Sequence, residues 1–365
     1  MVTSKESRET TIHVDDGLSA IEYCYEAGWT DGLPVIPPTM KLVDAMLDTV
    51  GIDPLAVIGE HVTTRRSCTA HAAAVNAVMA GCLPAHFPIV IAALKAMSKT
   101  DFNYHGSTAS TGGSSHLIVV SGPIADEIGM NATGNLFGSG NRANAAIGRT
   151  IRLIHLNVFH MQPNVTDKST QGNPGKYSLC VAERSDRNPW PLLHEEFGYP
   201  DDSIVVVFAA GGFHNVENHF AATPEQALLT MSDSMSCLDS LTHGQSVVVL
   251  SPETAEIVAA DASWTKSKVQ NFLFANAYRE NAALERIGRP TDTEEDRSHY
   301  KFSDDALKEG LTERYHRGLN AEDILLFVGG GDAGAHSAFL PSWSRGRNSI
   351  MQSEVILRAK KGWVN

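Results

Sequence analysis

Apolar side chains follow two patterns along this chain, and each pattern predicts a different kind of element. Four stretches are near-continuous runs of Val, Ile and Leu, which are typical of strands covered on both faces of a sheet. These apolar runs begin at His116, Ile204, Ser246 and Ile324, and the second and fourth of them end in glycines, at 211–212 and 329–331. A shorter apolar stretch, 179–183, predicts one more strand.

Elsewhere the apolar residues recur at helical spacing. Residues 15–28 predict an amphipathic helix, and Thr39 is the expected N-cap of the next one. Between them, residues 28–39 hold three prolines and two glycines, which predicts an extended, turn-rich segment. Further helices are predicted over 70–80, 86–99 and 223–238.

Two parts of the chain share one pattern. Residues 116–128 and 246–257 are each an apolar run, then a small residue and Pro, then Glu-Ile. Each is followed by a second apolar run that ends in glycines, 204–212 and 324–331, and each has a helix before its first strand. We therefore expect an α/β fold with an internally duplicated helix-strand-helix-strand unit and mainly parallel sheets.

The same patterns predict three divisions of the chain. An N-terminal segment with a Pro-rich turn, 1–69, is expected to wrap onto the rest. The first α/β copy, 70–220, holds a Gly/Asn-rich insertion, 129–190, and the second copy, 221–365, holds a charged helical insertion, 265–320. Because the active site of a duplicated protein often lies where the copies meet, we expect a site at their junction.

Composition narrows the function classes. The 365 residues are 42% hydrophobic and 19% charged, with a formal net charge of −13, so a general nucleic-acid binder is disfavoured. Five scattered cysteines without a Cys-x-x-Cys motif fit a reducing compartment, and no apolar signal or membrane-spanning stretch is present. A cytoplasmic protein without a membrane or nucleic-acid partner, able to form a homo-oligomer, is the expectation.

Two glycine-rich loops are candidates for binding an anion. The first, 107–116, contains Ser114 and ends at His116, a catalytic candidate. It resembles in part the Gly-Ser-Ser signature of the amidase family, but that family continues into a helix, whereas a strand follows here. Its backbone N–H groups could face an anion or oxyanion, and the alternative is a flexible turn.

The second loop, 138–144, leads into a helix whose N-terminus suits a carboxylate or phosphate. Asn141, Arg142 and Asn144 are its predicted substrate-binding residues, with Lys176 added from the turn before the short strand. The alternative is that Arg142 pairs only with surface carboxylates. No nucleotide cofactor is expected, because neither a complete Rossmann fingerprint nor a P-loop is present.

Glu183 and Cys180 lie near the end of the short strand, a usual position for site residues in α/β sheets. We predict Glu183 as a base or ligand, and Cys180 as a buried thiol, with a reactive thiol as the alternative.

Histidines follow both glycine turns. His214, Glu217 and His219 lie within six residues, and His336 follows the second turn. Imidazole serves either proton transfer or metal binding, so His219 and His336 are catalytic candidates. We also consider a divalent-metal site formed by His214, Glu217, His219 and His336. The alternative is that the histidines are exposed turn residues.

The segment 29–39, the Gly-Asn-Arg-Ala-Asn stretch 140–144 and the C-terminal Gly-rich turn resemble a family of bacterial proteins associated with the UGSC-type selenoproteins. This chain lacks selenocysteine and a Cys-Gly-Ser-Cys motif, so the redox signature of that family does not carry over, and the resemblance implies no defined reaction.

The leading hypothesis is a soluble enzyme, a hydrolase or lyase, that acts on a small anionic substrate of carboxylate type, with or without a metal. The alternatives are a thiol or redox enzyme that uses Cys180, and a non-catalytic ligand-binding or assembly protein.

Overall fold

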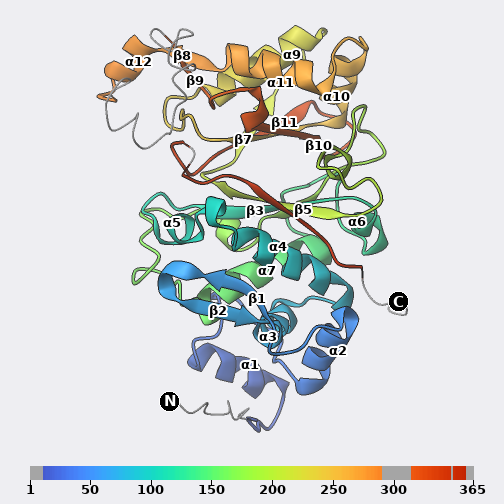
Figure 1. Ribbon diagram of the computed structural model, residues 1–365, viewed down its shortest axis with the longest axis vertical. Coiled ribbons are helices and arrows are strands. Elements are labelled where there is room, and N and C mark those ends of the chain that lie inside the picture. The colour runs from blue at the N-terminus through green and yellow to red at the C-terminus, as the bar shows by residue number, and fades with distance from the viewer. Residues whose placement is uncertain (1–10, 290–313, 347, 359–365) are drawn as a thin grey trace.

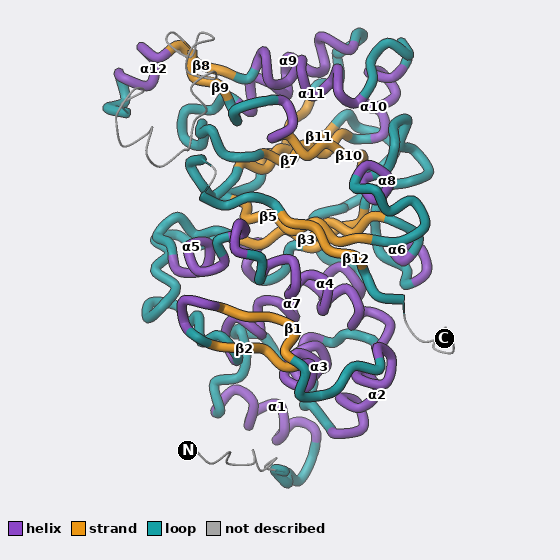
Figure 2. The backbone as a smooth tube through the Cα atoms, in the orientation of Figure 1, coloured by secondary structure: helices purple, strands orange, loops and turns teal. Residues whose placement is uncertain are grey.

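The computed structural model describes residues 11–289, 314–346 and 348–358. Two four-stranded sheets lie face to face, and helices cover the outer face of each sheet (Figure 1; Figure 2). The N-terminal segment forms a further layer beyond the helices of the first sheet. The predicted α/β class is therefore confirmed in its coarse form, with helices and mixed sheets. No helix in the described ranges is long and apolar enough to cross a membrane.

The N-terminal part is mostly helical, and its helices match the predicted ones closely. Its elements are α1 (Gly17–Glu26), α2 (Met40–Val50), the β1–β2 hairpin (Val57–His61 and Arg66–Thr69), α3 (Ala70–Ala80) and α4 (Phe87–Met97). Thr39 is the N-cap residue of α2, but its side chain makes no capping hydrogen bond. At α3, by contrast, the Thr69 side chain accepts a hydrogen bond from the backbone N–H of Ala72.

The first sheet has the order β12-β5-β3-β4. Its strands are β3 (Ser115–Ser121), β4 (Cys180–Ala182), β5 (Ile204–Ala210) and β12 (Gln352–Val355). β4 runs parallel to β3, whereas β5 is antiparallel to both β3 and β12. Helices α4 and α7 (Arg142–Asn157) cover its outer face (Figure 1), and short helices α5 (Tyr104–Ala109), α6 (Ile124–Glu127) and α8 (Leu193–Glu196) flank it.

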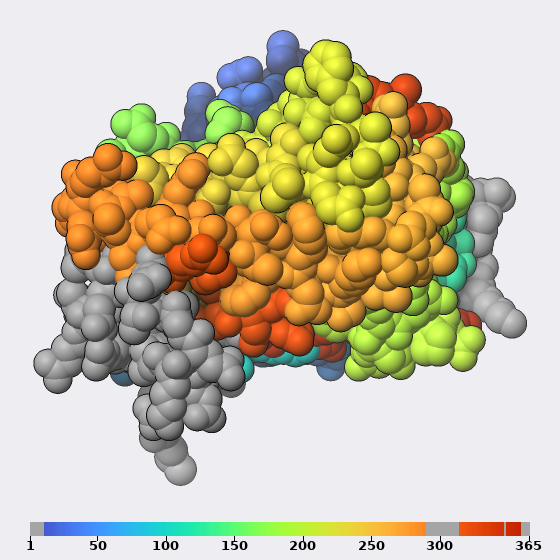
Figure 3. All heavy atoms as spheres, turned by 90° about the horizontal axis from the view of Figure 1, so that it is seen from above, coloured from blue at the N-terminus to red at the C-terminus, as the bar shows by residue number. Residues whose placement is uncertain are grey.

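The second sheet has the order β10-β7-β11-β6. Its strands are β6 (His214–Glu217), β7 (Ser246–Leu250), β10 (Ile324–Val328) and β11 (His336–Pro341). Helices α9 (Pro224–Met235), α10 (Pro252–Ala259) and α11 (Lys266–Asn276) cover its outer face, and Figure 3 looks down on this layer. At its side, β8 (Tyr278–Glu280) pairs with β9 (Arg314–His316), next to α12 (Asn281–Glu285).

The continuous apolar runs are explained by this layering. In β3, Leu117 and Val119 face the second sheet, while Ile118 and Val120 face the helices. Because successive side chains of a strand point to opposite faces, a strand with an apolar layer on each side is apolar at every position. Phe208 and Phe327 fill the space between the sheets, so the interior of the junction is an apolar core.

The expectation of mainly parallel sheets is not confirmed, because both sheets are mixed. Only β3–β4 and β7–β10 are parallel among the strand pairs described in the two sheets. The predicted match between 204–212 and 324–331 is wrong for the same reason: β5 is antiparallel to β3, whereas β10 is parallel to β7. Strand direction depends on the connection, which the apolar pattern does not report.

The two sheets nevertheless have the same layout. Each has a central strand (β3 or β7) with a parallel neighbour (β4 or β10) on one side and an antiparallel neighbour (β5 or β11) on the other. The strand that follows then crosses to the other sheet: β6 follows β5 but pairs with β11, and β12 follows β11 but pairs with β5. Each sheet is therefore completed by a strand from the other half of the chain.

The charged insertion predicted as helical over 265–320 is only partly so. Helices α11 and α12 lie in it, but β8 and β9 form a two-stranded sheet there. Its most acidic run, 291–297, lies outside the described residues.

Candidate functional site

Three of the predicted site residues, Ser114, His116 and Lys176, line one polar cavity at the start of β3. Its volume is about 20 Å³, which is room for one or two water-sized groups. The other lining residues come from α5, the start of β3, α7 and the loop before β4: Thr108, Ser115, Gly148, Ile151, Arg152, His155, Asp167 and Gly175. A small polar group is therefore what this cavity has room for.

Helix α7 forms one wall of the cavity. Gly148, Arg152 and His155 are three or four residues apart, so they lie on one face of the helix. Position 148 has no space for a larger residue, since a Cβ there would lie 2.4 Å from the Ser178 Oγ. This close approach holds the loop before β4 against the helix and brings Lys176 to the cavity.

The charged groups of the cavity leave one positive charge in excess. The Lys176 Nζ donates to the Asp167 Oδ2 at 2.6 Å and to the Ser169 Oγ at 2.6 Å. Arg152 approaches the same carboxylate oxygen, at 3.6 Å. Burial raises the pKa of Asp167, but hydrogen bonds from Lys176 and Ser169 outweigh it and lower the pKa overall, which keeps the carboxylate ionised. Two cations thus share one anion.

The histidines beside these charges are neutral. Burial, with the positive charges of Lys176 and Arg152, lowers the pKa of His116 to about 3. Its Nε2 lies 2.9 Å from the Ser107 Oγ. Burial also lowers the pKa of His155, whose Nε2 lies 2.8 Å from the Tyr104 hydroxyl. The two imidazole rings are 5.0 Å apart, so the cavity is backed by uncharged, hydrogen-bonded imidazoles.

Ser115 has a buried hydroxyl with no hydrogen-bond partner. The residue is 2% exposed and lines the cavity beside His116 and Lys176. An unsatisfied buried polar group costs about 1–3 kcal/mol, and most buried hydroxyls in proteins avoid this cost by finding a partner. The Ser115 hydroxyl therefore has an unused donor beside the cavity.

Glu183 lies at the other end of the same strand pair, in a cluster where its oxygens are occupied. The Glu183 Oε2 accepts from the Ser121 Oγ at 2.5 Å and from the Leu193 N–H at 2.9 Å, and its Oε1 accepts from Asn188 at 3.1 Å. His194 lies 3.0 Å from the Ser121 Oγ. Burial raises the pKa of Glu183, and hydrogen bonds from Ser121 and Leu193 oppose it.

The Gly/Asn loop uses its predicted binding groups for protein contacts. The Asn141 side chain caps α7 by accepting from the Asn144 N–H and donates to the Gly129 carbonyl. The Asn144 amide bonds the backbone of Asn131 in both directions. The Arg142 Nε donates to the Gly81 carbonyl at 2.9 Å. The structure does not bring these residues to the cavity of His116.

His219 and His336 do come together, with ring centres 5.3 Å apart, on the second sheet. His336 begins β11, opposite Glu217 of the antiparallel β6, and His219 lies in the turn that follows β6, so the two are not at matching positions of two copies. His214 contacts the ring of Phe339, on the face of β6 opposite to Glu217. Within the described ranges, no group of three or more His, Cys, Asp or Glu could hold a metal ion, so the predicted metal set is unsupported.

The roles of these side chains rest on their geometry alone, because comparison with protein-family models, with curated proteins and with solved structures finds no match to the chain. The resemblance to UGSC-associated proteins stays a prediction.

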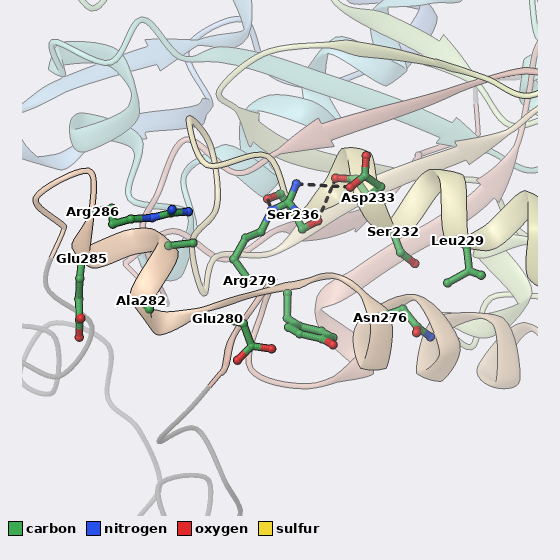
Figure 4. A pocket seen from close by; sticks show the side chains of 12 residues that line it. Leu229, Ser232, Asp233, Ser236, Asn276, Arg279, Glu280, Ala282, Glu285 and Arg286 are labelled. Carbon is green, nitrogen blue, oxygen red and sulfur yellow. Dashed lines mark hydrogen bonds and ion pairs between the residues drawn. The ribbon is translucent and has the colours of Figure 1, made fainter.

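A much wider depression lies between α9, α11, β8 and α12, with a volume of about 950 Å³ (Figure 4). Its charged side chains are exposed, and Arg279 bonds the Ser236 carbonyl at 2.9 Å and pairs with Asp233 at 3.3 Å. The described chain stops at Arg289, just beyond this lining. We regard the smaller cavity as the better candidate, because it combines buried charge, imidazoles and an unsatisfied hydroxyl.

Sequence reasoning missed Ser115, Arg152, Asp167 and His155. A signal for two of them was present, since Arg152 and His155 are polar residues on the face of the helix that Gly148 and Ile151 also occupy. Asp167 and Ser115 had no such signal, because their importance arises from neighbours distant in sequence.

Proposed function

We propose that this protein is an enzyme that binds the carboxylate group of a small anionic substrate in the cavity at the start of β3. Lys176 and Arg152 attract the carboxylate, and His116 moves a proton during hydrolysis or elimination. The proposal assigns no step to a metal, and it gives His214, Glu217, His219 and His336 no part in the reaction.

The observation that carries this proposal is the unsatisfied Ser115 hydroxyl beside an excess positive charge. A carboxylate oxygen would accept the Ser115 O–H and neutralise that charge at the same time. Hydrogen bonds to charged groups contribute more free energy than hydrogen bonds between neutral groups. A carboxylate could therefore bind with useful affinity although the cavity is small. The rest of a substrate would extend outward from the cavity.

The residues around the cavity have distinct roles in this proposal. Asp167 and Ser169 hold the Lys176 ammonium in one position. Ser107 holds His116 through its Nε2. From the second half of the chain, Trp343 donates its indole N–H to the Ser110 Oγ at 2.8 Å, which fastens the loop before β3. The second half therefore supports this loop, whereas the residues that line the cavity belong to the first half, so the cavity is not at the junction of the halves.

The thiol alternative has little support in this geometry. Cys180 is 5% exposed in β4 and packs in the core beneath α7. Burial raises the pKa of its thiol, and the reactive form of cysteine is the thiolate. Ligand binding without catalysis uses the same cavity, and it differs from the proposal only in the absence of turnover.

Calorimetric titration with acetate tests the binding part. Wild-type protein is expected to bind acetate, and Lys176→Met is expected to weaken binding tenfold or more, because it removes the closest cation. Lys168→Met is the matched control, since the Lys168 Nζ only donates to the Asn164 carbonyl at the surface. Equal affinity in the two variants would contradict the assignment.

Turnover is then tested with a panel of small ester and hydroxy carboxylates. His116→Asn is expected to abolish conversion while the folded protein still binds acetate. Acetate binding without conversion of any member of the panel would favour the non-catalytic alternative.

We further propose that the two halves derive from one duplicated unit, with boundaries near 70–220 and 221–365. The shared strand order and the exchanged strands β6 and β12 support this. A cytoplasmic location fits the five free cysteines, of which four are buried, and a homo-oligomer is retained as a proposal that sedimentation would test.

A further inference from the structure

We infer that binding of a carboxylate in this cavity is coupled to uptake of one proton by His116, which makes that imidazole the general acid of the site. The inference rests on the proposed function, because it needs an anion next to Lys176 and Arg152.

His116 lies where each surrounding element presents a charged or titratable group. The groups that face it are His61 from β1, Tyr104 from α5, Arg152 and His155 from α7, and Asp167 and Lys176 from the loop before β4. Lys176 and Arg152 oppose a positive charge on His116, and Asp167 favours one. In the absence of an anion, burial and the two cations together outweigh Asp167, and the imidazole is neutral.

A bound carboxylate reverses that balance. Placed about 4 Å from the ring in a partly buried site, one negative charge raises the proton affinity of an imidazole by roughly a thousandfold. Starting from a pKa of about 3, His116 would then titrate near pH 6. The substrate's own charge thus creates the acid that its reaction needs.

The hydrogen bonds identify where the proton goes. The Ser107 Oγ lies 3.1 Å from the Tyr104 carbonyl and 2.9 Å from the His116 Nε2; we assign its proton to the carbonyl, so that its oxygen accepts from the His116 Nε2–H. Neutral His116 therefore carries its proton on Nε2, and the new proton, taken from solvent, binds to Nδ1. Imidazolium formation breaks no existing hydrogen bond.

His155 is a poorer acceptor for the same proton. Burial keeps the pKa of Tyr104 high, so its hydroxyl stays protonated, and it lies 2.8 Å from the His155 Nε2. We assign this hydroxyl as the donor, so protonating that nitrogen would break the hydrogen bond. His155 is also only 4% exposed, deeper than His116.

The test is titration with acetate at pH 6.0 in buffers of different ionisation enthalpy, since the dependence of the binding heat on the buffer counts the protons taken up. About half a proton is expected at pH 6.0, falling towards zero at pH 7.5. His116→Asn is expected to abolish the uptake and to weaken acetate binding less than tenfold. His160→Asn is the control, because His160 is exposed and Asn tolerates its positive φ of 57°.

The outcomes separate the two proposals. Absence of acetate binding in every buffer would overturn the proposed function. Binding without proton uptake, or uptake that persists in His116→Asn, would overturn only this inference. If His116→Asn does not fold, nitrogen NMR of wild-type imidazoles decides: a single histidine must gain an Nδ1 proton on addition of acetate.

Discussion

The two ends of the β3–β4 strand pair both bury polar side chains, but they bury them differently. At the carboxyl end, Glu183 and Ser121 are enclosed by donors that fill the carboxylate. At the amino end, the Ser115 hydroxyl has no partner, two cations share Asp167, and a small cavity remains.

This difference distinguishes a polar cluster that stabilises the fold from one that could bind a ligand. A buried polar cluster whose members satisfy one another adds rigidity and specificity, and it needs no ligand. A buried cluster that leaves a hydroxyl, a charge and a space unused is incomplete without one. In the sequence, Glu183 was a candidate because it lies near a strand end, and His116 because it ends a glycine-rich loop; the hydrogen-bond partners distinguish them.

The largest difference expected between the two ends is their response to acid. The folded-state pKa of His116 is depressed to about 3, so its stabilising contribution is complete above about pH 6.5 and is lost as the pH falls. By pH 5 this amounts to about 2 kcal/mol for His116, and His61 and His155, whose pKa values are also lowered by burial, add to it. Urea unfolding at pH 7, 6 and 5 measures the loss.

The contribution of Glu183 to stability depends on pH in the opposite direction. Its folded-state pKa is raised, so its contribution is present at low pH and is lost as the pH rises. On acidification, the free energy of unfolding should therefore fall less in His116→Asn than in wild type. In Glu183→Gln it should fall more than in wild type. Parallel profiles for all three proteins would show that the two ends do not differ in this way.

The next largest effect is expected from Glu183→Ala. This change leaves Ser121, Asn188 and the Leu193 N–H without their acceptor, and we expect it to lower the free energy of unfolding by about 3 kcal/mol. Acetate affinity should be unchanged. The exposed Glu127→Ala is the control, expected within about 0.5 kcal/mol of wild type. Loss of acetate binding with unchanged stability would instead make Glu183 part of the site.

The smallest effect gives the sharpest comparison, because β3 begins and ends with serine. Ser121→Ala removes the donor to Glu183 and the acceptor for His194, and should cost about 1–2 kcal/mol. Ser115→Ala removes an unpartnered hydroxyl and should leave stability unchanged or higher by up to about 1 kcal/mol. Denaturant unfolding of the two variants side by side checks this; equal destabilisation would mean that Ser115 has a partner.

Much of the secondary structure was predictable from the sequence. The helix over 70–80 begins and ends at the predicted residues, and β5, β7 and β10 lie within the predicted apolar runs. Their positions depend on local spacing and on burial, which the order of apolar residues records directly. At the site, Ser114, His116 and Lys176 were candidates on local grounds, and the cavity includes them all.

What the sequence by itself determined is therefore which segments are helices and strands and which side chains have useful chemistry. The tertiary structure decided that β5 runs antiparallel to β3, that β6 and β12 exchange sheets, and that Arg152 and Asp167 lie beside His116. The physical reason is that an apolar pattern reports whether a residue is buried, whereas strand direction and hydrogen-bond partners depend on contacts between residues far apart in the chain. Whether a polar group is satisfied is such a property, and only the fold shows that Glu183 is and Ser115 is not.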